Sequence, residues 1–192
     1  MTITEYLAQH HKIEPGRNTM RFHRRDMIDM FNAIGYKTGV EIGVNNGRFA
    51  QYMCERIPNL KYYGIDPYNR YDDFRIASTN AMQHSYRKAA AKLTPFDAEI
   101  IPTFSALAYS RFENESIDFV YIDGNHSFNY VLMDILLWLP KIRKGGVISG
   151  HDYSDKPNEA TDVKAAVDFC IKSFRVQQWF LLRDTSWLWS VE

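Results

Sequence analysis

Residues 39–49 read G-V-E-I-G-V-N-N-G-R-F, and this stretch decides the fold. The β-branched residues before Gly43 predict a buried strand, which the Asn-Asn-Gly triplet then breaks. From Arg48 the apolar residues recur at helical spacing until Pro58 ends the helix. We expect glycines in such a turn because a ligand must approach the backbone more closely than a Cβ would permit. The stretch therefore predicts a strand, a ligand-binding turn and a helix whose first amides face the ligand.

A second predicted strand, residues 60–66 (L-K-Y-Y-G-I-D), ends on a carboxylate. This residue, Asp66, follows Gly43 by about the separation between the glycine turn and the ribose-binding acid in nucleotide-binding β-α-β units. A carboxylate can accept hydrogen bonds from both ribose hydroxyls at once. An Asp at a strand end is also a common turn residue. Because the glycine turn precedes Asp66 at this separation, we interpret Asp66 as a ribose ligand.

The rest of the chain alternates between strand and helix patterns. Residues 1–34 predict two helices, the first opened by a capping box of Thr2 and Glu5. Further strands are predicted at residues 98–101, 117–123, 145–150, 175–182 and 186–191, and helices at the end of 67–92 and at 105–112, 129–139 and 161–174. The last two strands form a hairpin. This order predicts an α/β fold with a mostly parallel sheet, helices on both faces and one antiparallel strand.

Composition limits the kinds of partner. At 192 residues and 45% hydrophobic, the chain is long and apolar enough for one well-packed domain. Lys and Arg together number 23, as do Asp and Glu, so no global field attracts nucleic acid or an anionic membrane. We therefore expect a small-molecule partner, no nucleic acid and no membrane, and leave the oligomeric state open, with a homodimer as one option.

Cysteine usage and the absence of targeting patterns indicate a reducing compartment. Cys54 and Cys170 lie far apart in predicted helices without metal-ligand spacing, so we expect buried thiols. The first residues lack a secretory signal, and the most apolar run, 131–139, contains Asp134 and is too short to span a bilayer. We expect a cytoplasmic protein.

Four motifs, taken in order, resemble one known family. They are V-E-I-G-V-N-N-G at 40–47, Asp66 at the end of the second strand, I-D-F-V-Y-I-D-G-N-H at 117–126 and K-G-G-V-I-S-G-H-D-Y at 144–153. Together with the terminal hairpin, they resemble a class I S-adenosylmethionine-dependent methyltransferase. The subgroup that the chain resembles most is the small-molecule O-methyltransferases, including metal-dependent enzymes that act on catechols and on macrolide sugars.

The resemblance covers about residues 36–192 and implies a Rossmann-like sheet of seven strands with a C-terminal antiparallel hairpin. Residues 1–35 would then form an N-terminal helical cap or lid. The turn departs from dinucleotide enzymes, since it reads E-x-G-x-x-x-G and Asn45 replaces the glycine that admits a pyrophosphate. This departure argues against a nicotinamide or flavin cofactor.

The resemblance also implies cofactor contacts. Residues at four strand ends would bind S-adenosylmethionine: Glu41 with the backbone of Gly43, Asn45 and Gly47 at the methionine end, Asp66 on the ribose, Pro67 or Tyr68 beside the adenine, Phe104 and Ser105 completing the adenine pocket, and Asp123 as a further cofactor contact.

The chemistry is expected at the carboxyl ends of the fourth and fifth strands. In the metal-dependent relatives, positions matching Asp123, His151 and Asp152 hold a divalent cation that orients the substrate oxygen and lowers its pKa. Mg²⁺ or Mn²⁺ would fit, and an imidazole ligand shifts the preference toward Mn²⁺, Fe²⁺ or Zn²⁺. The alternative is that His151 and Asp152 only hydrogen-bond loop backbone.

His126 lies three residues after Asp123, the spacing at which sugar O-methyltransferases carry their catalytic base. With Asp123, it would take the proton that an alcohol loses as it attacks the methyl group. The alternative is a polar residue at a helix start. We therefore expect an S-adenosylmethionine-dependent methyltransferase acting on a small-molecule hydroxyl, with a divalent metal and a His base.

Three other functions are left open: metal-independent N- or carboxyl-methyl transfer, S-adenosylmethionine binding without catalysis, and a nicotinamide or nucleotide-sugar enzyme. The acceptor cannot be identified from the sequence. Its pocket is expected from residues 1–34, the loop 67–76 and the segment after Tyr153. Candidate aromatic residues there are Phe22, Tyr68, Tyr71, Phe74 and Tyr153.

Overall fold

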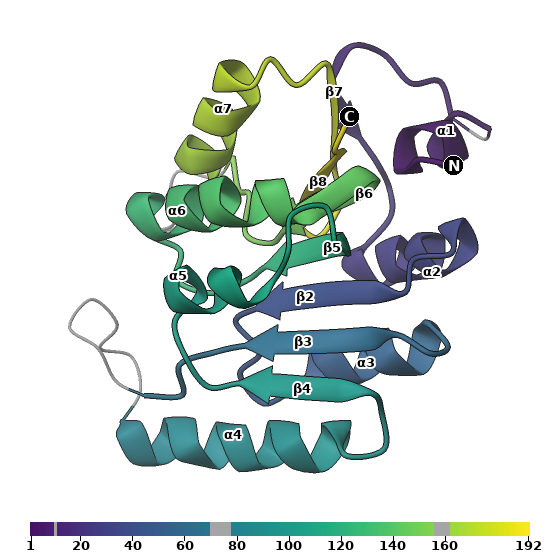
Figure 1. Ribbon diagram of the computed structural model, residues 1–192. Coiled ribbons are helices and arrows are strands. Elements are labelled where there is room, and N and C mark those ends of the chain that lie inside the picture. Colours follow the sequence, from purple (N-terminus) through teal and green to yellow (C-terminus); the bar gives the residue numbers. More distant parts are fainter. Residues whose placement is uncertain (10, 70–77, 156–161) are drawn as a thin grey trace.

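The computed structural model describes residues 1–9, 11–69, 78–155 and 162–192, which form an α/β fold with one sheet (Figure 1). The strands are β1 (Gly16–Thr19), β2 (Thr38–Ile42), β3 (Lys61–Ile65), β4 (Ala98–Ile101), β5 (Ile117–Ile122), β6 (Ile142–Gly150), β7 (Gln178–Leu181) and β8 (Trp187–Ser190). The helices are α1 (Ile3–Ala8), α2 (Arg24–Ile34), α3 (Arg48–Arg56), α4 (Thr79–Leu93), α5 (Ser105–Ala108), α6 (Phe128–Trp138) and α7 (Val163–Ser173), with 3₁₀ turns η1 (Tyr109–Arg111) and η2 (Leu139–Lys141).

The strand order is β1-β7-β8-β6-β5-β2-β3-β4. Strand β8 runs antiparallel to its neighbours β6 and β7, and all other pairs are parallel. The predicted mostly parallel sheet with an antiparallel hairpin is therefore confirmed, and the strands expected from residue 38 onward are present with ends shifted by a few residues. None of the described helices is long and apolar enough to cross a bilayer.

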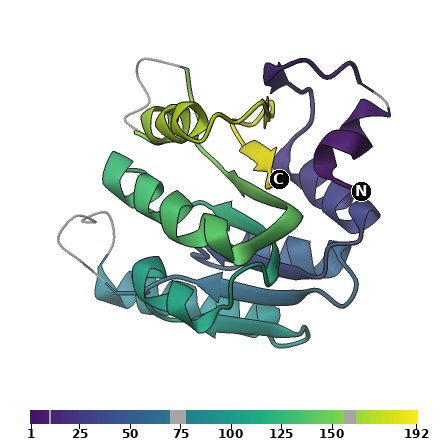
Figure 2. The ribbon, with the colours of Figure 1, turned by 45° about the horizontal axis from the view of Figure 1, so that its top comes forward.

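The predicted count of seven strands is wrong, because the described residues contain an eighth. Strand β1 pairs in parallel with β7, with Gly16 opposite Gln178, so the segment expected to contain only two helices also supplies an edge strand. Figure 2 shows this purple segment beside the yellow C-terminal strands. The turn between β7 and β8 also holds the start of α2, since the Arg183 amide donates to the Phe22 carbonyl (2.8 Å) and an Asp184 carboxylate oxygen accepts from the Arg24 amide (2.9 Å).

Side chains of β5 alternate between the two faces of the sheet. Phe119 and Tyr121 enter the core beneath α1, α2, α3 and α4, whereas Val120 and Ile122 enter the core beneath α6 and α7. The predicted helices on both faces are confirmed. The capping box of α1 is present, and both cysteines are free and buried as expected. The division of the chain at residue 35, with a cap or lid before it, stays a prediction.

Asp118 ties the amino ends of three central strands together. Its carboxylate accepts the backbone N–H groups of Lys37 (2.6 Å) and Thr38 (2.7 Å) and the Arg143 Nε–H (2.5 Å). The residue is buried. The carboxylate thus satisfies two amides at the start of β2 and pairs with a cation on β6.

We expect Asp118→Asn to lower the free energy of unfolding by about 2–4 kcal/mol, because an amide oxygen cannot replace all three acceptor contacts. Urea unfolding measures the change. The matched control is Glu99→Gln, which breaks an exposed ion pair with Arg111 (2.7 Å) and should cost less than about 1 kcal/mol. Equal losses in the two variants would contradict this role for Asp118.

Candidate active site

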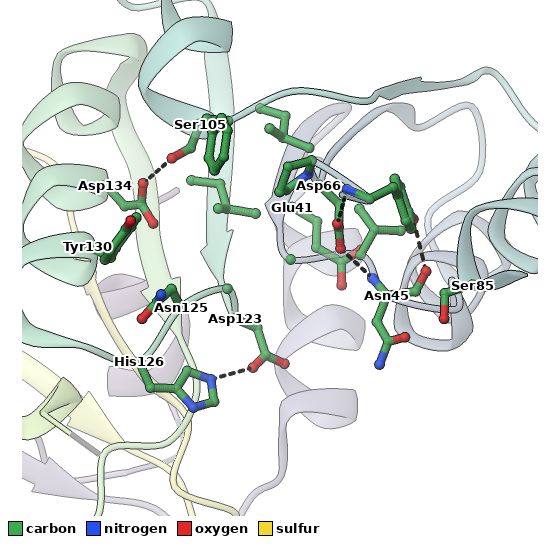
Figure 3. A pocket seen from close by; sticks show the side chains of 18 of the residues that line it. Glu41, Asn45, Asp66, Ser85, Ser105, Asp123, Asn125, His126, Tyr130 and Asp134 are labelled. Atoms are coloured by element: carbon green, nitrogen blue, oxygen red, sulfur yellow. Dashed lines mark hydrogen bonds and ion pairs between the residues drawn. The ribbon is translucent and has the colours of Figure 1, made fainter. Parts of the chain in front are cut away.

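A cavity of about 780 Å³ opens at the carboxyl ends of β2, β3, β4 and β5. Figure 3 shows side chains from these strand ends and from α6 pointing into it. Nine of the predicted site residues line it: Glu41, Gly43, Asn45, Asp66, Pro67, Phe104, Ser105, Asp123 and His126. The described lining does not include Gly47, His151 or Asp152. Parallel strands thus bring most of the predicted residues to one edge of the sheet.

The glycine turn is shaped by contacts within the protein. Gly43 has φ +94°, and a Cβ there would lie 2.1 Å from the Asp123 carbonyl oxygen. Gly47 has φ +72°, and its Cβ would lie 2.8 Å from the Ala89 Cα. Positive φ and close backbone packing therefore require both glycines. The sequence interpretation, which gave ligand approach as the reason, missed these two contacts.

Asp66 locks the glycine turn to the loop after β3. Its carboxylate accepts the backbone N–H groups of Asn45 and Tyr68, each at 2.9 Å, and the Tyr68 hydroxyl donates to the Asn45 carbonyl (2.9 Å). Burial raises the pKa of Asp66 despite these amides. The carboxylate keeps further acceptor positions, so its geometry is compatible with the predicted ribose role.

Glu41 is a carboxyl group at the cavity wall with 2% of its surface exposed. The Tyr62 hydroxyl donates to it. Burial raises the pKa of Glu41 to about 8, although the Tyr62 hydrogen bond acts in the opposite direction. A cationic group of a ligand placed beside Glu41 would favour its ionised form.

Charged groups of alternating sign form a row that begins at the cavity wall. Arg24 Nη1 lies 3.3 Å from Asp123 Oδ2, and Asp123 Oδ1 lies 3.6 Å from His126 Nε2. Asp152 then contacts two imidazoles, His126 Nε2 at 3.1 Å and His151 Nδ1 at 3.1 Å. Figure 3 shows the contact between Asp123 and His126. Each carboxylate is therefore flanked by two groups that are or can become cationic.

These contacts shift the pKa values of three groups. The contact with Asp123, together with the charges of Asp152 and Asp123, raises the pKa of His126 against the effect of burial. Burial lowers the pKa of His151, but its hydrogen bond to Asp152 and the nearby carboxylates outweigh this effect and raise the pKa overall. The hydrogen bond from His151 lowers the pKa of Asp152. Asp152 has φ 61°, a left-handed conformation that is uncommon outside glycine.

Three side chains of this charged row have the ligand atoms that a divalent cation needs. Asp123, His126 and Asp152 offer ligand atoms that all lie within 4.8 Å of one another. The predicted set had His151 in place of His126, but in the structure His126 stands between the two carboxylates. Two oxygens and one nitrogen suit Mn²⁺, Fe²⁺ or Zn²⁺ better than Mg²⁺. The metal site itself, and the imidazole that would serve as its ligand, stay predictions.

Arg24 and Asp134 are two of the cavity-wall residues that sequence reasoning missed. Arg24, on α2, places its guanidinium 4.8 Å from the centre of the Phe49 ring and beside Asp123. On sequence it belongs to a charged helix face that solvation explains equally well. Asp134, on α6, is buried, and its only sequence signal is a carboxylate within the most apolar run.

The expected aromatic acceptor pocket is only partly placed by the structure. Tyr68 lines the cavity. Phe22 instead lines a smaller cavity between α1 and α2, and the described lining of the main cavity does not include Tyr153. Tyr71 and Phe74 lie outside the described residues.

Comparison with known proteins gives a family match. Residues 40–153 match the family described as "Methyltransferase domain". An uncharacterised protein of Acanthamoeba polyphaga mimivirus is 27% identical over 121 residues, which cover 62% of this chain and 52% of that protein. The chain therefore aligns with about half of the length of this relative.

Solved structures share the fold. The O-methyltransferase TomG from Streptomyces achromogenes, involved in tomaymycin synthesis and solved with S-adenosylmethionine, superposes with a TM-score of 0.63 at 10% identity, covering 88% of this chain and 80% of that one. An O-methyltransferase from Bacillus cereus, solved with S-adenosylhomocysteine, gives 0.61 at 13% identity, covering 86% and 78%. At these identities the likeness concerns the fold.

Glu41 predicts a specific dependence of stability on pH. Its pKa rises from 4.5 in the unfolded chain to about 8 in the fold. Folding therefore retains a proton that the unfolded chain releases between these values. The stabilising contribution is complete below pH 4.5 and is lost as the pH rises toward 8, by at most about 1.4 kcal/mol per pH unit. We expect Glu41→Gln, measured by urea unfolding without ligand, to be increasingly more stable than the wild type as the pH rises.

Glutamine keeps an acceptor for the Tyr62 hydroxyl and cannot ionise, so the comparison isolates the titration of Glu41. Other buried acids contribute to the pH dependence of both proteins and cancel in the difference. Parallel stability curves between pH 5 and 8 would show that Glu41 titrates normally.

Proposed function

The chain belongs to the methyltransferase-domain family, and on that premise we propose that it transfers the methyl group of S-adenosylmethionine to a hydroxyl group of a small molecule. One observation carries the proposal. A single cavity joins the glycine turn and Asp66 on one side to the carboxylate-imidazole chain around Asp123 on the other. A cofactor and an acceptor bound in it would meet at the carboxyl ends of the central strands.

The cofactor would occupy the part of the cavity formed by β2, β3 and β4. Glu41 would attract the cationic methionine end, Asp66 would accept from the ribose hydroxyls, and the adenine would lie near Pro67, Phe104 and Ser105. TomG and the Bacillus cereus enzyme, which share this fold, were solved with S-adenosylmethionine and S-adenosylhomocysteine. The E-x-G-x-x-x-G turn suits this cofactor because it has no phosphate that must approach the backbone.

The acceptor hydroxyl would lie near His126. Methyl transfer needs the oxygen, the methyl carbon and the sulfur in line, and most of the rate enhancement would come from holding them so. His126 Nε2 would accept the hydroxyl proton, and Asp123 and Asp152 on either side would stabilise the imidazolium that results. A divalent cation held by Asp123, His151 and Asp152 would orient the substrate oxygen and lower its pKa. If His126 were the ligand instead, its Nε2 could not also accept the proton, and the cation alone would favour the deprotonated oxygen.

A metal-independent transferase is the second candidate, and one contact favours it. The Arg24 guanidinium already lies 3.3 Å from Asp123 Oδ2 and neutralises part of the carboxylate charge that would attract a cation. Stacking on Phe49 holds this guanidinium in place. The two candidates differ in their response to a chelator and in their affinity for Mn²⁺.

The cofactor assignment predicts that Asp66→Asn weakens S-adenosylhomocysteine binding by about 10- to 100-fold, since an amide has one acceptor oxygen where a carboxylate has two. Isothermal titration calorimetry measures the affinity. Glu99→Gln, which changes a distant exposed acid, should bind like the wild type. Wild-type protein that binds NAD but not S-adenosylhomocysteine would overturn the proposed cofactor.

The proposed base predicts that His126→Gln lowers methyl transfer by about 10²- to 10⁴-fold while leaving S-adenosylhomocysteine affinity unchanged. Transfer is followed as release of S-adenosylhomocysteine over a panel of small hydroxyl compounds. A rate equal to that of the wild type would remove His126 from the mechanism.

For the metal, we expect wild-type protein to bind Mn²⁺ in calorimetry and Asp152→Asn to bind it at least about tenfold more weakly, because one charged ligand is lost. Excess EDTA should then stop transfer, and Mn²⁺ should restore it. Full activity in EDTA together with no Mn²⁺ binding would favour the metal-independent candidate.

A further inference from the structure

A buried carboxyl group lies in the cavity wall, and the proposed reaction does not use it. Asp134 is 4% exposed and projects from α6, whose other buried residues are Val131, Ile135 and Trp138. It lines the same cavity as Ser105 and Asp66. Figure 3 shows Asp134 and Ser105 on the side of the cavity opposite Asp66. A carboxyl group at such a place in an apolar helix needs hydrogen-bond donors.

The protein supplies only some of the hydrogen-bond donors that the Asp134 carboxyl group can accept. The Ser105 hydroxyl donates to Asp134 Oδ1, and among the described residues it is the one hydrogen-bond donor to this side chain. Burial raises the pKa of Asp134 to about 7, against the effect of Ser105. An ionised carboxylate has room for about four hydrogen bonds. The second oxygen is therefore available to a donor that a ligand brings.

The surrounding wall restricts the shape of that ligand. Ile65, Pro67 and Phe104 contribute apolar surface to the same cavity as the polar pair formed by Ser105 and Asp134. A flat ring with apolar faces and an N–H donor at its edge suits a cavity lined in this way. The adenine of the proposed cofactor has this chemistry, since its 6-amino group donates two hydrogen bonds.

We propose that Asp134 accepts a hydrogen bond from the 6-amino group of the adenine and thereby selects an adenosyl cofactor over one with a 6-oxo base. The inference rests on the proposed function, because it assumes that the cavity binds S-adenosylmethionine. A 6-oxo base would place a carbonyl oxygen against the carboxyl group, and with the ionised carboxylate both acceptors would be left without a donor. Sites that hydrogen-bond a ligand group reject the analogue lacking that group far better than apolar sites do.

The test compares S-adenosylhomocysteine and S-inosylhomocysteine, which differ in the 6-substituent of the base and in the proton on the adjacent N1, by isothermal titration calorimetry. Wild-type protein should bind the adenosyl ligand about 10- to 100-fold more tightly, the range for a hydrogen bond to a charged group. In Asp134→Asn, Oδ1 can keep the Ser105 hydrogen bond while an N–H₂ group replaces the second oxygen. The preference should therefore fall by about tenfold or more, through weaker adenosyl binding.

Two further variants separate selectivity from folding. Asp134→Leu fills a similar volume without polar atoms and should also bring the affinity ratio toward one. Glu99→Gln should keep the wild-type ratio. The ratio is a better readout than affinity alone, because a general loosening of α6 weakens both ligands together.

Each result has one meaning. Wild-type protein that binds neither ligand would overturn the proposed function. Wild-type protein that binds both equally well, or Asp134 variants that bind S-adenosylhomocysteine with the full wild-type preference, would overturn the role of Asp134 and leave the proposed function standing.

Discussion

The approach of two backbones, at Gly43 and Asp123, is the constraint on which the site depends. The Ile42 carbonyl accepts from the Asp123 amide, and the Gly43 amide donates to the Ile65 carbonyl, both at 2.8 Å. These bonds continue the sheet one residue beyond β2 and β5, where a Cβ on Gly43 would collide with the Asp123 carbonyl. The glycine turn, the loop that carries Asp66 and the loop that carries Asp123 are thus held at fixed spacing by the backbone itself. This junction therefore fixes the distance between the side chains proposed to bind the cofactor and those proposed to bind the acceptor.

The acids around the cavity fall into two groups with opposite electrostatic character. Among the described residues, Glu41 and Asp134 are buried without an ion-pair partner, and burial raises the pKa of each. Asp123 and Asp152 instead lie between cationic or protonatable groups, and the pKa of Asp152 is lowered. Glu41 and Asp134 can accept hydrogen bonds or a positive charge from a ligand, whereas Asp123 and Asp152 already have oppositely charged or protonatable partners within the protein. This contrast agrees with the proposed division of the cavity into a binding part and a reacting part.

The central β-α-β unit was predictable because its signals are local: a β-branched strand, a turn of Asn and Gly, and a helix ended by Pro58. Strand β1 was not, since Gly16–Thr19 is a short, mostly polar edge strand that exists only through its pairing with β7. The place of His126 between two carboxylates also escaped prediction. It depends on the left-handed backbone of Asp152, which turns that side chain toward both imidazoles and has no signature in residue spacing.

The hydrogen bonds between the β7–β8 turn and the start of α2 affect when Arg24 becomes fixed during synthesis of the chain. The backbone hydrogen bonds that join β2, β3 and β5 at the junction of Gly43 and Asp123 involve no residue after Asp123, although β5 also pairs with the later strand β6. Arg24 is synthesised early, but the start of its helix is held by a hydrogen bond to Asp184, which is synthesised much later. Contacts so distant in sequence form late. A newly made chain would therefore fix the guanidinium beside Asp123 only after residue 184 has been added.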